Sequence, residues 1–131
     1  MNQLDDVTPA GGDGGVRGVM GLPNGNRAIV APTKITHDLL DDGHPDGGPK
    51  SRFLRSFGLD LASPGLLKDA LLAHPMTHDV SATHLVEQGE VFEVTGPMLA
   101  PDGRLPMIRT VWIILKGETD PRFVTLKPVW R

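Results

Sequence analysis

Hydrophobic and polar positions alternate most clearly in residues 106–115, which are rich in β-branched residues and have no internal glycine or proline. Successive side chains point to opposite faces of a strand, so Thr110 and Trp112 are predicted to share one face and Arg109 the other. A long strand that carries a cation and a hydroxyl could support a site on a rigid scaffold. The alternative is that Arg109 lies at a strand edge and Trp112 is an ordinary core residue.

The same two-residue period extends over the whole second half of the chain and predicts an antiparallel meander. Turn residues at 88–89, 101–103 and 116–117 separate the predicted strands. We expect strands at residues 80–87, 91–95, 107–115 and 122–129.

The first half of the chain shows helical spacing instead. A short strand at 27–31 is expected to precede helices at 32–40, 49–57 and 63–74, and Pro75 is expected to stop the last of them. Helices followed by a sheet indicate an α+β fold, with the N-terminal helices packed on one face of a four-stranded antiparallel sheet. Residues 18–131 are predicted to form this single domain, and the Gly- and Asp-rich residues 1–17 a disordered acidic leader.

Composition excludes several classes of function. The chain has no cysteine, which rules out disulfides, thiolate zinc sites and a cysteine nucleophile. It has no tyrosine and only 5% aromatic residues, so a base-stacking platform is not expected. No apolar run approaches the roughly 20 residues of a membrane span, and no signal peptide is recognisable, so a cytoplasmic protein is expected.

Charge is distributed unevenly along the chain. The net charge is -3, but residues 1–48 hold seven Asp against three Lys or Arg, while residues 49–131 hold nine acidic and ten basic residues. The acidity therefore lies mainly outside the predicted sheet, and an anionic substrate is compatible with the rest.

Motif spacing favours neither a metal nor a cofactor. No histidine pair has the spacing of a metal site, and no glycine-rich phosphate loop, nucleophile elbow or paired catalytic carboxylate pattern occurs. The remaining candidates are cations and hydroxyls, and metal-free phosphodiester cleavage needs such groups for proton transfer and for charge stabilisation. Taken singly, each candidate is more simply explained as an ordinary polar surface residue. Only their placement together in the fold would indicate a site for phosphodiester cleavage. The candidates are His44, Lys50, Arg52, His78, Arg109, Thr110 and Thr125.

Six short motifs resemble a family of small bacterial domains over about residues 20–128. They are Leu22-Pro-Asn, Lys34-Ile-Thr, His44-Pro-x-Gly-Gly-x-Lys50-x-Arg-Phe, Gly96-Pro-Met-Leu with Pro101-Asp-Gly, Arg109-Thr-Val-Trp112 and Pro121-Arg-Phe-Val-Thr125. The order of elements also resembles the nuclease superfamily of barnase, EndoU, colicin D and RelE. Its members are mostly metal-independent ribonucleases deployed as toxins, many of which a cognate antitoxin or immunity protein neutralises.

The resemblance implies a metal-independent endoribonuclease in which an RNA 2′-hydroxyl attacks the adjacent phosphate. His44 would be the general base or acid, and Lys50 and Arg109 would stabilise phosphate charge. Thr110 would orient the substrate and Thr125 would face it. The substrate-binding residues would be Arg52, His78 and Trp112.

Two departures from the family pattern leave alternatives open. Leu126-Lys127 replaces Ala-Tyr, which removes an aromatic residue that could stack on a base, and proline and serine flank Lys50 in place of smaller residues. An inactive or repurposed copy is one alternative. Another is a protein-binding module, namely an antitoxin, an immunity protein or a phage-associated adaptor.

Overall fold

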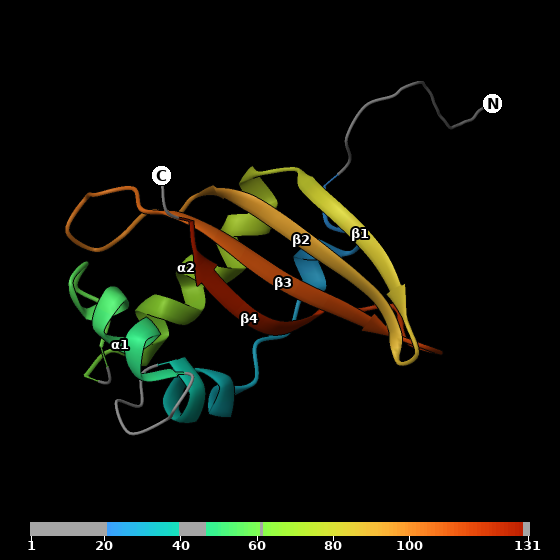
Figure 1. Cartoon of the computed structure of the whole chain (residues 1–131), viewed down its shortest axis with the longest axis horizontal. Helices are drawn as coiled ribbons and strands as arrows, with labels where there is room; N and C mark the ends of the chain where they lie inside the picture. Colours follow the sequence, from blue (N-terminus) through green and yellow to red (C-terminus); the bar gives the residue numbers. More distant parts are fainter. Residues whose placement is uncertain (1–20, 40–46, 61, 130–131) are drawn as a thin grey trace.

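The structure is a computed structural model that describes residues 21–39, 47–60 and 62–129 (Figure 1). The predicted leader lies outside these residues. The elements in chain order are the 3-10 helix η1 (Gly25–Arg27), the π-helix η2 (Lys34–Leu39), α1 (Gly47–Arg55), α2 (Pro64–Thr77), β1 (Val80–Val86), β2 (Gly89–Pro97), β3 (Met107–Leu115) and β4 (Arg122–Pro128).

The strands form a four-stranded antiparallel sheet in the order β1-β2-β3-β4. The predicted α+β class and the antiparallel meander are confirmed, and the bounds of β3 are those predicted. Two register shifts interrupt the ladder: Ser81 is an extra residue in β1 opposite Glu93 and Val94, and Val124 is an extra residue in β4 opposite Val111 and Trp112. Such bulges bend a strand locally and change the direction of nearby side chains.

The alternation predicted for β3 is also confirmed. Thr110 pairs with Val94 on the buried side of the sheet, whereas Arg109 pairs with Thr95 on the opposite side. We call the side that carries Thr95 and Arg109 the open face. The strand therefore separates its hydroxyl and its cation as its period requires.

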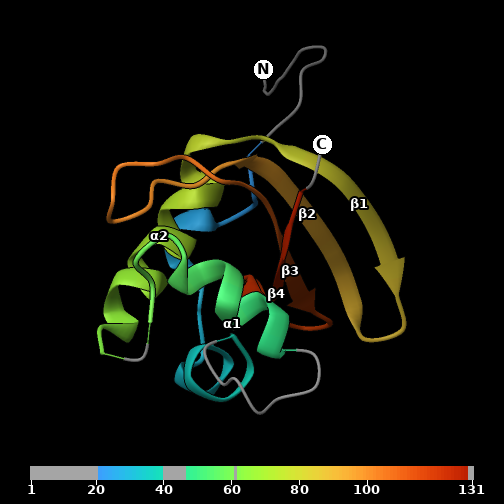
Figure 2. The same cartoon turned by 60° about the vertical axis from the view of Figure 1, so that its left-hand side comes forward.

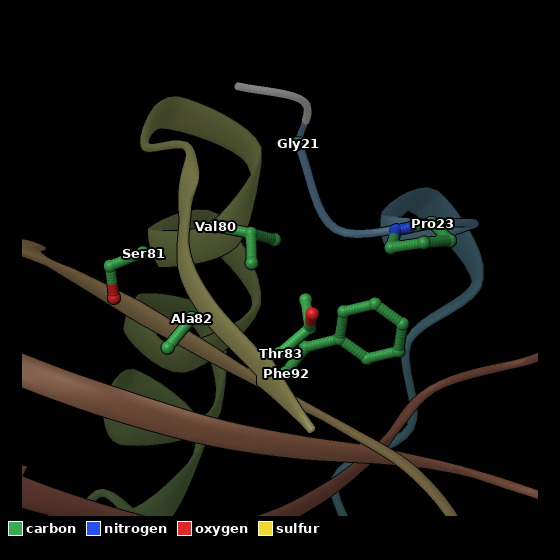
Figure 3. Close-up of a pocket in the computed structure, with 7 residues that line it drawn as sticks. All are labelled: Gly21, Pro23, Val80, Ser81, Ala82, Thr83 and Phe92. Atoms are coloured by element: carbon green, nitrogen blue, oxygen red, sulfur yellow. The ribbon is translucent and has the colours of Figure 1, made fainter. Parts of the chain in front are cut away.

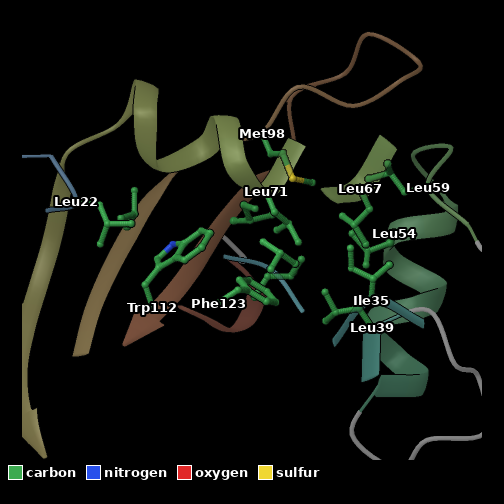
Figure 4. Close-up of a cluster of buried hydrophobic side chains, with 14 of the residues drawn as sticks. Leu22, Ile35, Leu39, Leu54, Leu59, Leu67, Leu71, Met98, Trp112 and Phe123 are labelled. Atoms are coloured by element: carbon green, nitrogen blue, oxygen red, sulfur yellow. The ribbon is translucent and has the colours of Figure 1, made fainter. Parts of the chain in front are cut away.

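Helix α2 packs against the buried side of the sheet. Leu67 and Leu71 are fully buried in one cluster with Trp112 and Phe123, whose rings meet edge to face with centroids 5.4 Å apart (Figure 4). Burying each such leucine contributes about 1.5–3 kcal/mol. This cluster fixes the sheet on its buried side and leaves the open face for other contacts.

The prediction that Pro75 stops this helix is wrong, because α2 continues to Thr77. Pro75 removes one backbone donor near the helix end, where the loss affects only the last turn. The Thr77 hydroxyl donates to the carbonyl oxygens of Ala73 (3.2 Å) and His74 (3.3 Å), and the Pro75 side chain is buried. Tertiary burial therefore outweighs the local preference of proline.

The segments before α2 differ from prediction in detail. The expected strand at 27–31 contributes only a parallel bridge between Ile29 and Arg122, and the expected helix at 32–40 is the shorter π-helix η2. Helix α1 begins at Gly47 and lies beside η2 and strand β4 (Figure 2). Among the described residues, no helix combines the length and hydropathy needed to cross a membrane.

Candidate functional site

Two predicted site residues meet where α1 reaches β4. Lys50 lies in the first turn of α1, and its Nζ donates a hydrogen bond of 2.7 Å to Thr125 Oγ1. The Thr125 hydroxyl in turn donates to the carbonyl oxygen of Leu126 at 3.3 Å. The contact joins residues 75 positions apart in the sequence, and both side chains are partly buried. It holds a cation at a defined position beside the edge strand.

The strand register places further cations next to this contact. Thr125 pairs with Val111, and the next pair on the same face is Arg109 with Lys127. Residues two apart along a strand are separated by about 7 Å. Lys127 therefore lies one such step from Thr125 along β4, and Arg109 lies diagonally opposite Thr125 on the neighbouring strand β3.

Arg109 leans toward β2 on the open face. Its Nε donates to Thr95 Oγ1 at 3.2 Å and lies 3.6 Å from Glu93 Oε1, and its side chain is 42% exposed. The shorter contact is the hydrogen bond, whereas the carboxylate is at ion-pair distance. Arg109 thus remains accessible to an anion while two neighbours fix its direction.

Sequence reasoning missed the polar residues around Arg109. Glu93 Oε2 lies 3.3 Å from His84 Nε2, and Ser81 Oγ lies 3.1 Å from Thr95 Oγ1. We call Ser81, His84, Glu93, Thr95 and Arg109 the open-face cluster. Alternation within residues 91–95 could have placed Glu93 and Thr95 on one face, but their pairing with Arg109 depends on the register.

Thr110 and Trp112 lie on the other side of the sheet, inside the core. Both side chains have an exposure of 0%. Trp112 Nε1 donates to Thr110 Oγ1 at 2.9 Å, and Thr110 Oγ1 lies 2.9 Å from His74 Nδ1. Neither can touch a substrate on the open face, so their predicted roles in orienting and binding substrate are not retained.

When the His74 ring is neutral, the buried network has a single consistent assignment of protons. His74 Nε2 lies 3.0 Å from the Gly96 carbonyl oxygen, which can only accept, so Nε2 carries the proton. His74 Nδ1 then accepts from the Thr110 hydroxyl, which accepts from Trp112. Burial lowers the pKa of His74, and the nearby His78 lowers it further, although the bond to Gly96 opposes this. His74 is therefore neutral near pH 7.

We expect acid to destabilise the protein through His74. Its pKa is lowered from 6.5 in the folded state, so the unfolded chain binds a proton that the folded protein does not. The free energy of unfolding should fall as pH drops below about 6.5, by up to about 1.4 kcal/mol per pH unit, until the lowered pKa of the folded state is reached.

Urea unfolding at several pH values between about 7.5 and 5.5 would measure this slope. A His74→Gln variant should lose the slope in this range. The control is His84→Gln, because His84 is half exposed and lies outside the buried network, so this variant should keep the slope. An unchanged slope in the His74 variant would contradict the assignment.

The other predicted site residues are not brought together in the same way. His78 Nε2 bonds the Pro97 carbonyl oxygen at 2.7 Å, and its ring centroid lies 5.0 Å from that of His74, at the far end of α2. Arg52 is exposed on α1, but residues two apart on a helix point in different directions, so it does not share a face with Lys50. His44 lies outside the described residues.

A separate hollow of about 320 Å³ lies beside β1 (Figure 3). Its lining has no titratable side chain and consists of Gly21, Pro23, Val80, Ser81, Ala82, Thr83 and Phe92. The part of the chain that the structure describes also holds no group of three His, Cys, Asp or Glu side chains suited to a metal ion. The hollow can accept an apolar group but offers no acid or base.

Comparison with solved structures finds a similar fold in a chain of a complex described as "Contact-dependent growth inhibition toxin - immunity protein complex from Klebsiella pneumoniae 342". The TM-score is 0.61 and the sequence identity 13%, and the match covers 77% of this chain and 99% of the other. At this identity the likeness concerns the fold alone. No curated protein sequence matches the chain.

A family model matches residues 21–129, which include every described element from η1 to β4. The matched range contains Lys50, Thr125 and the whole open-face cluster. The chain therefore belongs to DUF6883, a family described as a domain of unknown function.

Proposed function

We propose that this domain is a metal-independent endoribonuclease and the toxin of a bacterial conflict system. The observation that carries the proposal is the hydrogen bond of 2.7 Å from Lys50 to Thr125, next to the outward pair of Arg109 and Lys127. Three cations in this arrangement match the charge of an RNA backbone. All three cations lie in residues 49–131, where ten basic residues balance nine acidic ones.

The reaction would be an internal transfer at phosphorus. The 2′-oxygen loses its proton and bonds to phosphorus, the bond from phosphorus to the 5′-oxygen breaks, and that oxygen gains a proton. The products are a 2′,3′-cyclic phosphate and a 5′-hydroxyl. Lys50 and Arg109 would stabilise the negative charge that builds on the phosphoryl oxygens, and Thr125 would hold the Lys50 ammonium in position.

His44 completes the proposed machinery as general base or acid. It precedes α1, whose first turn carries Lys50. An imidazole titrates near neutral pH and can both accept and donate a proton, as the two halves of the reaction require. Substituting alanine for His44 should abolish cleavage and toxicity without unfolding the protein.

Purified protein incubated with total RNA in EDTA tests the proposal. Discrete fragments with 2′,3′-cyclic ends are expected, and Arg109→Ala should reduce their formation by about 100-fold. Arg122→Ala is the matched control, because Arg122 is also an exposed strand arginine beside a carboxylate, 3.0 Å from Glu118. An absence of cleavage with or without divalent ions would refute the proposal.

A protein-binding module is the second candidate, and the open edge of the sheet favours it. β1 is an edge strand, six of its seven residues are exposed, and Leu85 is 81% exposed. An exposed edge strand can pair with a strand of another protein. The structural neighbour comes from a complex of a toxin with its immunity protein, which fits either member of such a pair.

Expression in a bacterial host separates the two candidates. A ribonuclease toxin should stop growth unless a cognate partner protein is co-expressed, whereas a binding module should be harmless. Harmless expression of a folded, soluble protein that also fails to cleave RNA would favour the binding module.

A further inference from the structure

Glu93 occupies a distinctive position among the acidic side chains. It lies in the middle of β2, with Oε1 3.6 Å from Arg109 Nε and Oε2 3.3 Å from His84 Nε2. Its side chain is 23% exposed, so the carboxylate is partly shielded but reachable from the open face. Both oxygens are thus directed by neighbours while the group stays accessible.

The other carboxylates in described ion pairs lie in loops. Asp102 pairs with Arg104, Asp120 with Arg27 and Glu118 with Arg122. Of the carboxylates that form described ion pairs, Glu93 is the one on a strand and the one beside a residue of the candidate site. A strand with neighbours on both sides holds a side chain more rigidly than a loop does.

We propose that Glu93 accepts the proton of the attacking 2′-hydroxyl, an inference that rests on the proposed ribonuclease function. The carboxylate takes the proton as the bond from the 2′-oxygen to phosphorus forms. The bond from phosphorus to the 5′-oxygen then breaks, and the leaving 5′-oxygen takes up a proton from water.

The surroundings of Glu93 suit this role. Arg109 can contact the phosphate whose neighbouring hydroxyl Glu93 deprotonates, because the two side chains lie side by side. His84 acts as a positioning residue that directs the carboxylate through Oε2. Ser81 and Thr95 bond to each other across the strands and, through Thr95, to Arg109, which fixes the guanidinium relative to Glu93.

The test is Glu93→Gln in the full chain, with cleavage of a defined RNA oligonucleotide as the readout. We expect kcat to fall by about 100-fold or more, which is typical for loss of a general base. Affinity for a non-cleavable oligonucleotide with a 2′-deoxy at the scissile position should change by less than about threefold, because the phosphate contacts remain.

Two further variants make the result specific. Glu90→Gln is the matched control, since Glu90 is exposed on the same strand and should be dispensable. Glu93→Asp keeps the carboxylate but shortens the side chain by one methylene group, so we expect partial activity. Equal thermal midpoints would show that each variant is folded.

Three results would overturn the inference. If Glu93→Gln cleaves normally while Arg109→Ala does not, Glu93 is not the base and the ribonuclease proposal stands. If Glu93→Gln binds and cleaves RNA better than the parent, Glu93 restrains Arg109 instead. If the parent protein does not cleave RNA at all, the inference fails together with the proposed function.

Discussion

Replacing Lys50 with alanine should lower the rate of RNA cleavage by about 100-fold or more, because removing one preorganised donor to a developing oxyanion typically has an effect of this size. The ammonium is held 2.7 Å from Thr125 Oγ1 before substrate binds, so little reorganisation is needed during the reaction. Thr125→Val should have a smaller effect, about tenfold, since it removes one hydrogen bond of the lysine but not its charge. Single-turnover cleavage of a defined oligonucleotide measures both rates.

Lys116→Ala is the matched control for Lys50, because Lys116 is an exposed lysine in the turn after β3. It should leave the rate unchanged. Lys50→Arg should restore part of the activity by retaining the charge with different geometry. Normal cleavage by a folded Lys50→Ala protein would remove Lys50 from the site and with it the main support for the proposed function.

Replacing Thr110 with valine should lower the free energy of unfolding by roughly 2–4 kcal/mol, because it leaves two buried groups without hydrogen-bond partners. These groups are His74 Nδ1 and Trp112 Nε1, each 2.9 Å from the Thr110 hydroxyl. Valine has nearly the shape of threonine, so the change isolates the hydroxyl. Urea unfolding at neutral pH would measure the loss.

Thr110→Ser retains the hydroxyl and should cost less than about 1.5 kcal/mol, mainly from one lost methyl group. If Thr110 has only a structural role, the loss of RNA cleavage in Thr110→Val should equal the fraction of protein that is unfolded. Under conditions in which this variant is fully folded, it should cleave RNA at the normal rate. A folded variant with normal stability and no cleavage would instead return Thr110 to the catalytic machinery.

Side-chain alternation was sufficient to predict the sheet. In residues 107–115 it separated Arg109 from Thr110 and Trp112, and the register places them on opposite faces. Strand period is a local property that depends on the order of residues rather than on distant contacts. The same local signals predicted helices near Lys50 and Leu67, although the helix ends were less accurate.

Pro75 shows where local signals failed. As a helix breaker it was expected to stop α2, yet its buried ring and the hydroxyl of Thr77 sustain another turn. The candidate site was predicted in part for a similar reason. Lys50 and Arg109 were identified by charge, whereas Glu93 and His84 were missed because ordinary surface residues of these types occur on many strands.

The order of residues along the chain determined the α+β class, the strands and the face on which each strand residue lies, since these depend on neighbours close in sequence. The tertiary structure decided which of the polar residues meet. It joined Lys50 to Thr125 across 75 positions, placed Glu93 beside Arg109 and buried Thr110 against His74. Contacts between distant segments depend on register and packing, which a one-dimensional pattern does not contain.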